Sequence, residues 1–217
     1  MLLRSLVGLA AVTSLLSAPR HTRAAVAADP EYLISTWQTD DGLPENSATA
    51  MVQTPDGYLW FGTFNGLVRF DGVRFTVFDH ANTPELPSGE IVSLHLDREG
   101  RLWISTPLGM AFVKDGRFTV YTHGHGWSGN YARFFAEGPN GALYVSTFDD
   151  KLLEWGADGF REIDFPYAPL AARSGIRLHV DEADALWAVT DRFVGRREGA
   201  AWHEMVPSAE WRAEGGH

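Results

Sequence analysis

Short apolar stretches alternate with turn residues along the chain, and one such pattern returns four times. It occupies Asp56–Thr63, Glu99–Thr106, Asn140–Thr147 and Asp184–Thr190, each with a leucine followed by an aromatic residue. These aromatic residues are Trp60, Trp103, Tyr144 and Trp187, and they are spaced by 43, 41 and 43 residues. A fixed period of this length is typical of proteins built from repeated units. The sequence therefore predicts four copies of one structural unit, with the match weakest in the fourth, where no glycine follows Asp184.

Each unit carries a second turn signal, at Asp71-Gly72, Asp115-Gly116, Asp158-Gly159 and Glu198-Gly199. Glycine after an acidic or amide residue favours tight hairpins, because it reaches positive φ without strain. Strand-like runs precede the first turn, at Ala50–Gln53, Ile91–Leu96, Phe134–Ala136 and Ile176–Val180. Further runs follow the second turn, as in Arg74–Phe78 and Arg117–Tyr121. Each unit is therefore predicted to contain four antiparallel strands.

Four-stranded antiparallel units at this period are the blades of a β-propeller. We predict an all-β fold with four four-stranded blades. The anchors Trp60, Trp103, Tyr144 and Trp187 fall in the second strand, where a flat ring packs between neighbouring sheets. A helical solenoid would show a 3.6-residue period, which is absent, and a β-sandwich gives no reason for a fourfold repeat.

The N-terminus has the features of a secretory signal peptide. A basic start, Met1–Arg4, precedes the apolar run Leu6–Leu16 and the small residues Ala25–Ala27. The run is shorter than the roughly 20 residues of a membrane span, although an uncleaved anchor is the alternative. We predict export to the periplasm or beyond, with no membrane span in the mature chain. The predicted segments are a signal peptide (1–27), a leading strand and linker (28–47), blades 1 to 4 (48–89, 90–130, 131–175 and 176–207) and a polar tail (208–217).

The charge balance argues against binding to nucleic acid. Lys and Arg number 18 against 28 Asp and Glu, a formal charge of −10. A nucleic-acid surface needs a basic face to neutralise phosphates. Because there is no cysteine, disulfides and thiolate metal sites are excluded.

Three stretches, Trp37–Ser47, Gln53–Thr63 and Gly66–Gly72, resemble the opening of two-component regulator propeller proteins. The resemblance implies a periplasmic sensor with seven-bladed propellers, followed by an output such as a histidine kinase or diguanylate cyclase. No output motif is present here, so we interpret the chain as ligand-sensing input, an incomplete arc of a larger propeller. Its partners would be the missing blades and the signalling domains. A closed four-bladed ring is the alternative, in which Tyr32–Trp37 would pair as a strand with the last blade.

Propeller ligands usually bind where loops from several blades converge. On that face we place the connections 79–89, 122–130 and 166–175 and the turns between second and third strands. The side chains there are aromatic or amide-rich, so we expect a small molecule or an oligosaccharide and no cofactor. Solvated loop residues without a ligand are the alternative interpretation. The candidate ligand contacts are Asn46, Asn65, His80, Trp127, Asn130, Tyr131, Asp149 and Arg192.

Four histidines are candidates for other roles. His123 and His125 lack a third metal ligand at a recognised spacing, so we interpret them as part of a glycine-rich loop and predict no metal site. His95 and His179 hold matching places in first strands. They face either the channel or the core, and we prefer hydrogen-bonded core histidines.

Enzymatic propellers such as streptogramin lyases and lactonases share the glycine–leucine–tryptophan pattern. They need inward-facing acids, histidines or a metal, whereas most acids of this sequence stand at turns. We predict no catalytic residue. A lyase or lactonase is the second hypothesis, and a protein-interaction scaffold is the third.

Overall fold

The computed structural model describes residues 34–167 and 175–205. Residues 36–167 and 175–205 belong to one compact unit. The predicted signal peptide (1–27) and polar tail (208–217) lie outside the described residues. None of the helices in the described ranges is long and apolar enough to span a membrane.

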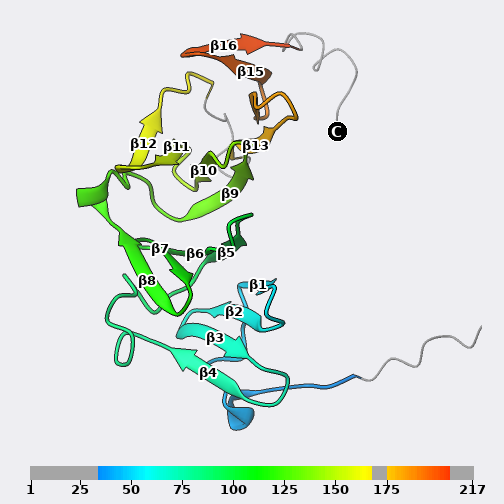
Figure 1. Cartoon of the computed structure of the whole chain (residues 1–217), viewed down its shortest axis with the longest axis vertical. Helices are drawn as coiled ribbons and strands as arrows, with labels where there is room; N and C mark the ends of the chain where they lie inside the picture. Colours follow the sequence, from blue (N-terminus) through cyan, green and yellow to red (C-terminus); the bar gives the residue numbers. More distant parts are fainter. Residues whose placement is uncertain (1–33, 168–174, 206–217) are drawn as a thin grey trace, which may run out of the picture. The chain divides into compact units, whose positions relative to one another are not determined.

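The described strands form four sheets of four consecutive antiparallel strands, which we call blades 1 to 4 (Figure 1). Blade 1 contains β1 (Ala50–Gln53), β2 (Leu59–Thr63), β3 (Gly66–Phe70) and β4 (Phe75–Phe78). Blade 2 contains β5 (Ser93–Leu96), β6 (Leu102–Thr106), β7 (Gly109–Lys114) and β8 (Arg117–Tyr121). Blade 3 contains β9 (Ala132–Glu137), β10 (Leu143–Thr147), β11 (Leu152–Gly156) and β12 (Gly159–Ile163). Blade 4 contains β13 (Arg177–Val180), β14 (Leu186–Val189), β15 (Val194–Glu198) and β16 (Ala201–Glu204). Two short 3-10 helices, η1 (Thr39–Asp41) and η2 (His123–His125), precede blades 1 and 3.

The first strands of successive blades lie beside one another: β1 contacts β5, β5 contacts β9, and β9 contacts β13. Each blade is a simple meander in which neighbouring strands are neighbours in sequence. Meandering four-stranded sheets joined through their first strands are the architecture of propeller blades. The predicted fold class is confirmed.

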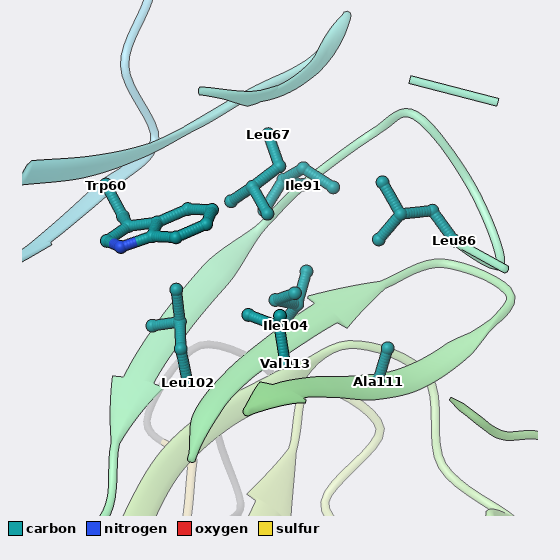
Figure 2. Packing of buried hydrophobic residues seen from close by; sticks show 8 residues of the cluster. All are labelled: Trp60, Leu67, Leu86, Ile91, Leu102, Ile104, Ala111 and Val113. Carbon is teal, nitrogen blue, oxygen red and sulfur yellow. The ribbon is translucent and has the colours of Figure 1, made fainter. Parts of the chain in front are cut away.

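The aromatic anchors of the first three blades are buried between consecutive sheets. Trp60 packs with Ile104 and Val113 of blade 2, as Figure 2 shows. Trp103 is fully buried against blade 3, and Tyr144 packs against Leu186 of blade 4. Burying a large ring at each junction removes apolar surface from water and stabilises the contact between blades. The predicted position of the anchors in the second strand is therefore confirmed.

The indole nitrogen of each tryptophan anchor has a partner six residues earlier. Trp103 Nε1 donates to Asp97 Oδ2 at 2.7 Å, and Trp187 Nε1 donates to Asp181 Oδ2 at 2.8 Å. In blade 1 the acceptor is Thr54, at 3.1 Å. These bonds satisfy the indole N–H groups, whose burial without a hydrogen-bond partner would cost free energy.

Small residues two positions after the anchor fasten one blade to the next. Ser105 Oγ accepts a hydrogen bond from the Ala132 N–H at 2.8 Å, and Ser146 Oγ donates to the Ile176 carbonyl at 2.6 Å. Gly62 holds the same position in blade 1, where a side chain would meet Ile91 of blade 2. The serines at this position therefore link consecutive blades by hydrogen bonds.

The second turns of the units are not all alike. Asp115 and Gly116 both have positive φ, 50° and 73°, as the expected two-residue hairpin turn requires. At Asp71 the loop is longer: the Asp71 N–H donates to the Arg74 carbonyl, and the Asp71 carboxylate accepts from the Val73 and Arg74 N–H groups. The hydrogen bonds to the Asp71 carboxylate stabilise this longer loop, so the tight two-residue turn is not formed there.

The first turn of blade 4 corrects the sequence alignment. Asp184 has a φ of 63° and stands three residues before its anchor, where the other blades have Gly57, Gly100 and Gly141. The glycine is therefore not missing after Asp184, since Asp184 itself takes the glycine position. Aspartate tolerates this left-handed conformation better than most residues, which explains why the turn survives.

The predicted leading strand is not a strand over its described part. Residues 34–38 have no regular structure, and Tyr32 and Leu33 lie outside the described residues. Trp37 instead packs on Phe70 and Phe75 of the β3–β4 hairpin, with ring centroids 5.1 and 6.1 Å apart. These ring contacts give Trp37 a partner on blade 1 without strand pairing.

Candidate functional site

One end of every blade carries the turn between its second and third strands, beside the start of its first strand. We call this the loop end. Threonine stiffens the turn: Thr63 Oγ1 donates to the Gly66 carbonyl at 2.8 Å, and Thr106 Oγ1 donates to the Gly109 carbonyl at 2.9 Å. Binding residues often lie on loops that a rigid scaffold holds in place, and these blades provide such a scaffold for their turns.

Apolar side chains are exposed in these turns in three consecutive blades. Phe64 is 50% exposed, Leu108 63% and Phe148 47%. Single exposed apolar residues are ordinary. Their recurrence at the same turn of blades 1, 2 and 3 gives the loop end exposed apolar surface that a partner or ligand could cover.

Three of the predicted ligand contacts come together at blade 3. The Asn130 N–H donates to Asp149 Oδ1 at 2.9 Å, and the Phe148 N–H donates to the Tyr131 carbonyl at 3.0 Å. The Tyr131 and Phe148 rings meet edge to face, with centroids 5.8 Å apart. The connection into β9 and the turn after β10 are thus tied into one surface. With Arg133, which lies beside it, this group is the loop-end cluster: Asn130, Tyr131, Arg133, Phe148 and Asp149.

Two arginines flank aromatic rings at this place. Arg133 Cζ lies 4.9 Å from the ring centroid of Phe148 and 5.5 Å from that of Phe134. Arg177, on the first strand of blade 4, has its Cζ 5.1 Å from the Phe134 centroid. Cation–π contacts hold both guanidinium groups against these rings.

The carboxylates of this turn have opposite electrostatic environments. Burial raises the pKa of Asp150, and the charges of Asp149 and Asp191 add to this while Arg133 opposes it. Burial also acts to raise the pKa of Asp149, but hydrogen bonds from Thr147 and the Asn130 N–H outweigh it and lower that pKa. Asp149 is therefore held as a charged acceptor, while Asp150 is the more easily protonated of the pair.

A hollow of about 260 Å³ opens beside these groups, lined by Gly175, Arg177, Val189, Thr190 and Asp191. Gly175 has a φ of 65°, and a Cβ atom there would lie 2.6 Å from Arg133 Nη1. Only glycine leaves the guanidinium this space. The loop end at blades 3 and 4 thus combines aromatic faces, hydrogen-bond donors and acceptors, a set suited to recognising a polar ligand.

The remaining predicted contacts are not part of this group. Trp127 is 1% exposed and packs on Phe160, so we leave it out of the candidate site. Asn46 accepts from the Thr39 N–H at 2.9 Å, and Arg192 donates to the Pro166 carbonyl at 3.4 Å, so both brace loops. Asn65 and His80 are exposed, on or near blade 1.

The histidines lie in unlike surroundings. His123 and His125 form the exposed helix η2, where His125 Nδ1 accepts from the Thr122 N–H at 3.4 Å. Within residues 34–167 and 175–205, no group of three or more His, Cys, Asp or Glu side chains is placed to hold a metal ion. His95 stacks on Phe135 of blade 3 with centroids 4.7 Å apart, but its Nε2 has no hydrogen-bond partner in the described part. His179 is exposed, so the preferred interpretation of two hydrogen-bonded core histidines is wrong.

Sequence reasoning missed Phe148, Arg133 and Arg177. The repeat alignment could have identified Phe148, because it follows the second strand of blade 3 as Phe64 follows that of blade 1. The arginines lie on first strands, and no spacing in the sequence signals that two strands 44 residues apart present them to one ring.

Two segments, residues 42–65 and 85–107, match the family model "Two component regulator propeller". These segments cover the first turn and second strand of blades 1 and 2. The resemblance drawn from the sequence is therefore confirmed for these two repeats. No curated protein sequence matches the chain significantly.

Solved structures with a similar fold include a streptogramin B lyase, at 22% identity and a TM-score of 0.57, with 76% of this chain and 56% of the lyase covered. The extracellular domain of a protein described as a hybrid two component system of B. thetaiotaomicron matches at 18% identity and a TM-score of 0.58, covering 71% of this chain and 22% of that one. A domain described as part of a one component system of the same organism matches at 17% and 0.58, covering 76% and 23%. The chain thus spans about half the length of the lyase and under a quarter of the two extracellular domains. At these identities the likeness concerns the fold.

Proposed function

We propose that this chain is the ligand-sensing input propeller of an extracytoplasmic signalling protein of the two-component type. The observation that carries the proposal is the match of two repeats to the two-component regulator propeller model. The ligand site is the loop-end cluster together with the neighbouring Arg177, where aromatic, cationic and amide groups from separate segments converge. The ligand is a small polar molecule, for which an oligosaccharide is our leading candidate.

Location outside the cytoplasm rests on two supports. The first is the predicted signal peptide at residues 1–27, with its basic start and short apolar run. The second is that two structurally similar proteins are described as extracellular domains. The output would be a kinase or cyclase domain belonging to the same signalling system.

The four blades belong, in this proposal, to a larger propeller. Blade 4 presents Trp187 on the sheet face that corresponds to the covered faces of blades 1, 2 and 3, and this ring is only half-buried. Val189, two residues further along β14, and its strand partner Val194 lie on the same sheet face, as expected of a face that receives a further blade.

Enzymatic activity and a scaffold role are the other hypotheses. The likeness to streptogramin B lyase concerns the fold, and fold alone does not transfer an activity. Incubating the purified chain with streptogramin B and following the substrate peak by chromatography tests the first. We expect the peak to persist, whereas its enzyme-dependent loss would establish the lyase.

Binding to a printed array of neutral and acidic oligosaccharides tests the sensing proposal directly. We expect the labelled full chain to bind a defined subset of these oligosaccharides. Phe148→Ala and Arg177→Gln should each weaken that binding at least about fivefold, by removing an aromatic face or a charge-assisted donor.

Arg161→Gln is the matched control, because Arg161 is an exposed arginine of the same blades that pairs with Glu154 away from the loop end. It should bind like the unaltered chain. The ligand site is wrong if both loop-end variants retain full binding, and oligosaccharide sensing is wrong if nothing on the array is bound.

A further inference from the structure

A hollow lies between blades 1 and 2, at the end of the strands opposite the loop end. Its volume is about 360 Å³, within the range of pockets that hold small molecules. Trp60, Arg69 and Phe78 line it from blade 1, and Leu102, Val113 and Phe118 line it from blade 2. Figure 2 shows Trp60 facing Leu102 and Val113 across this junction.

Lys114 and Arg69 are the cations that line this pocket. Lys114 is exposed, whereas Arg69 is half-buried and is the one that aromatic rings surround. Arg69 Cζ lies 4.5 Å from the Tyr58 ring centroid and 5.8 Å from the centroids of Trp60 and Phe78. Within the described residues Arg69 forms no hydrogen bond and no ion pair. Aromatic faces hold this guanidinium in place, but its hydrogen-bond donors have no protein acceptor.

The matching positions in the other blades show that this is unusual. In each blade one residue of the third strand pairs with the anchor on the second strand. Arg69 pairs with Trp60, Arg196 with Trp187 and Glu154 with Tyr144. Arg196 pairs with Glu198, and Glu154 pairs with Arg161. Blade 2 has an uncharged residue, Phe112, at this position. Of these four, only the charge in blade 1 lacks a partner in the described part.

The walls and rim of the pocket restrict what would pair with Arg69. Leu102 and Val113 are buried core residues, so the floor is apolar. The rim carries the acids Asp56 and Asp115 and the exposed base Lys114, while the third acid, Glu99, is paired with Arg101 at 2.8 Å. The rim carboxylates disfavour a ligand with several negative charges. A single carboxylate on an apolar body meets both conditions, because guanidinium groups bind carboxylates in a two-point geometry.

We propose that the pocket between blades 1 and 2 binds a small monocarboxylate with an apolar ring or chain, and that Arg69 receives the carboxylate. The site is separate from the loop-end cluster and goes beyond the sensing function proposed for it. Either site therefore stands if the other fails.

Isothermal titration of the full chain with 3-phenylpropanoate and with its neutral amide tests the proposal. We expect the carboxylate to bind at least about tenfold more tightly than the amide, since only the carboxylate pairs with Arg69. Arg69→Gln should remove this preference. Arg196→Gln is the matched control, because it changes an arginine at the same position of blade 4, and it should leave binding unchanged.

Equal affinity for the amide and the carboxylate would overturn the proposal, as would unaltered carboxylate binding by Arg69→Gln or no binding of either probe. Circular dichroism of each variant establishes that it is folded. If Arg69→Gln does not fold, the comparison of carboxylate and amide on the unaltered chain still decides the outcome, and Arg69→Lys then tests the two-point geometry.

Discussion

His95 and His179 occupy the same place in the first strands of blades 2 and 4, yet one is packed and the other is exposed. His95 stacks on Phe135 of the next blade, and burial lowers its pKa below 6.5 while the charge of Asp97 opposes this. Its Nε2 has no partner in the described part. Protonation of His95 therefore adds a charge to a junction between blades that offers it no acceptor.

This arrangement predicts that stability falls as the pH is lowered through the histidine range. The unfolded chain binds a proton at His95 near pH 6.5, whereas the folded chain does so only at lower pH. Because the unfolded state then binds more protons, the free energy of unfolding decreases below about pH 6.5. His95→Phe should show a smaller loss of melting temperature between pH 7.5 and 5.5 than the unaltered chain.

His179, the exposed histidine at the same position of blade 4, provides the comparison with His95. His179→Phe should follow the pH profile of the unaltered chain, since no neighbouring blade in the described part covers its ring. Parallel pH profiles for His95→Phe and the unaltered chain would contradict the assignment of the effect to His95.

At the scale of elements, the turns carry two kinds of glycine. Gly57 turns the chain between β1 and β2 with a φ of 90°, and a Cβ atom there would meet nothing within 4 Å. Gly126 ends helix η2 with a φ of 78°, and a Cβ atom there would lie 1.8 Å from the Phe160 carbonyl oxygen. The first glycine is needed for its backbone conformation, and the second also for a close approach between segments.

Alanine substitution separates these roles. Gly57→Ala should reduce the free energy of unfolding by about 1–2 kcal/mol, the cost of a left-handed residue with a side chain. Gly126→Ala should cost about 1–3 kcal/mol more, because the backbone of β12 must move to admit the methyl group. Urea unfolding measures both changes, and equal losses would show that the approach to Phe160 is not tight in solution.

At the scale of the whole molecule, blades depend on one another through their aromatic anchors. Trp103 is fully buried between blades 2 and 3, whereas Trp187 is half-buried on blade 4. Both have a similar indole hydrogen bond. The two positions thus differ mainly in whether the structure describes a following blade.

Truncating each anchor tests this dependence. Trp103→Ala should cost about 3–5 kcal/mol, the usual loss for a large buried ring. Trp187→Ala should cost roughly half of that or less in this chain, because less apolar surface returns to water. Chemical denaturation gives both values, and Trp103→Phe serves where Trp103→Ala does not fold. A larger loss at Trp187 than at Trp103 would contradict the order of blade packing.

The repeat period and the turn residues were sufficient to predict four four-stranded blades and the burial of the first three anchors. The reason is local: alternating side chains and glycine turns determine strands and hairpins from neighbouring residues. The same local signals placed Asn130, Tyr131 and Asp149 on loop-end segments that the fold then joins.

Contacts between blades were decided by the tertiary structure alone. Loop position made Trp127 a predicted ligand contact, yet packing against Phe160 buries it. Arg133 and Arg177 meet one phenyl ring from two blades, and Arg69 lacks the acidic partner that Arg196 has. Residues about one repeat apart become neighbours only when sheets stack, and burial and charge pairing depend on that stacking and not on sequence spacing.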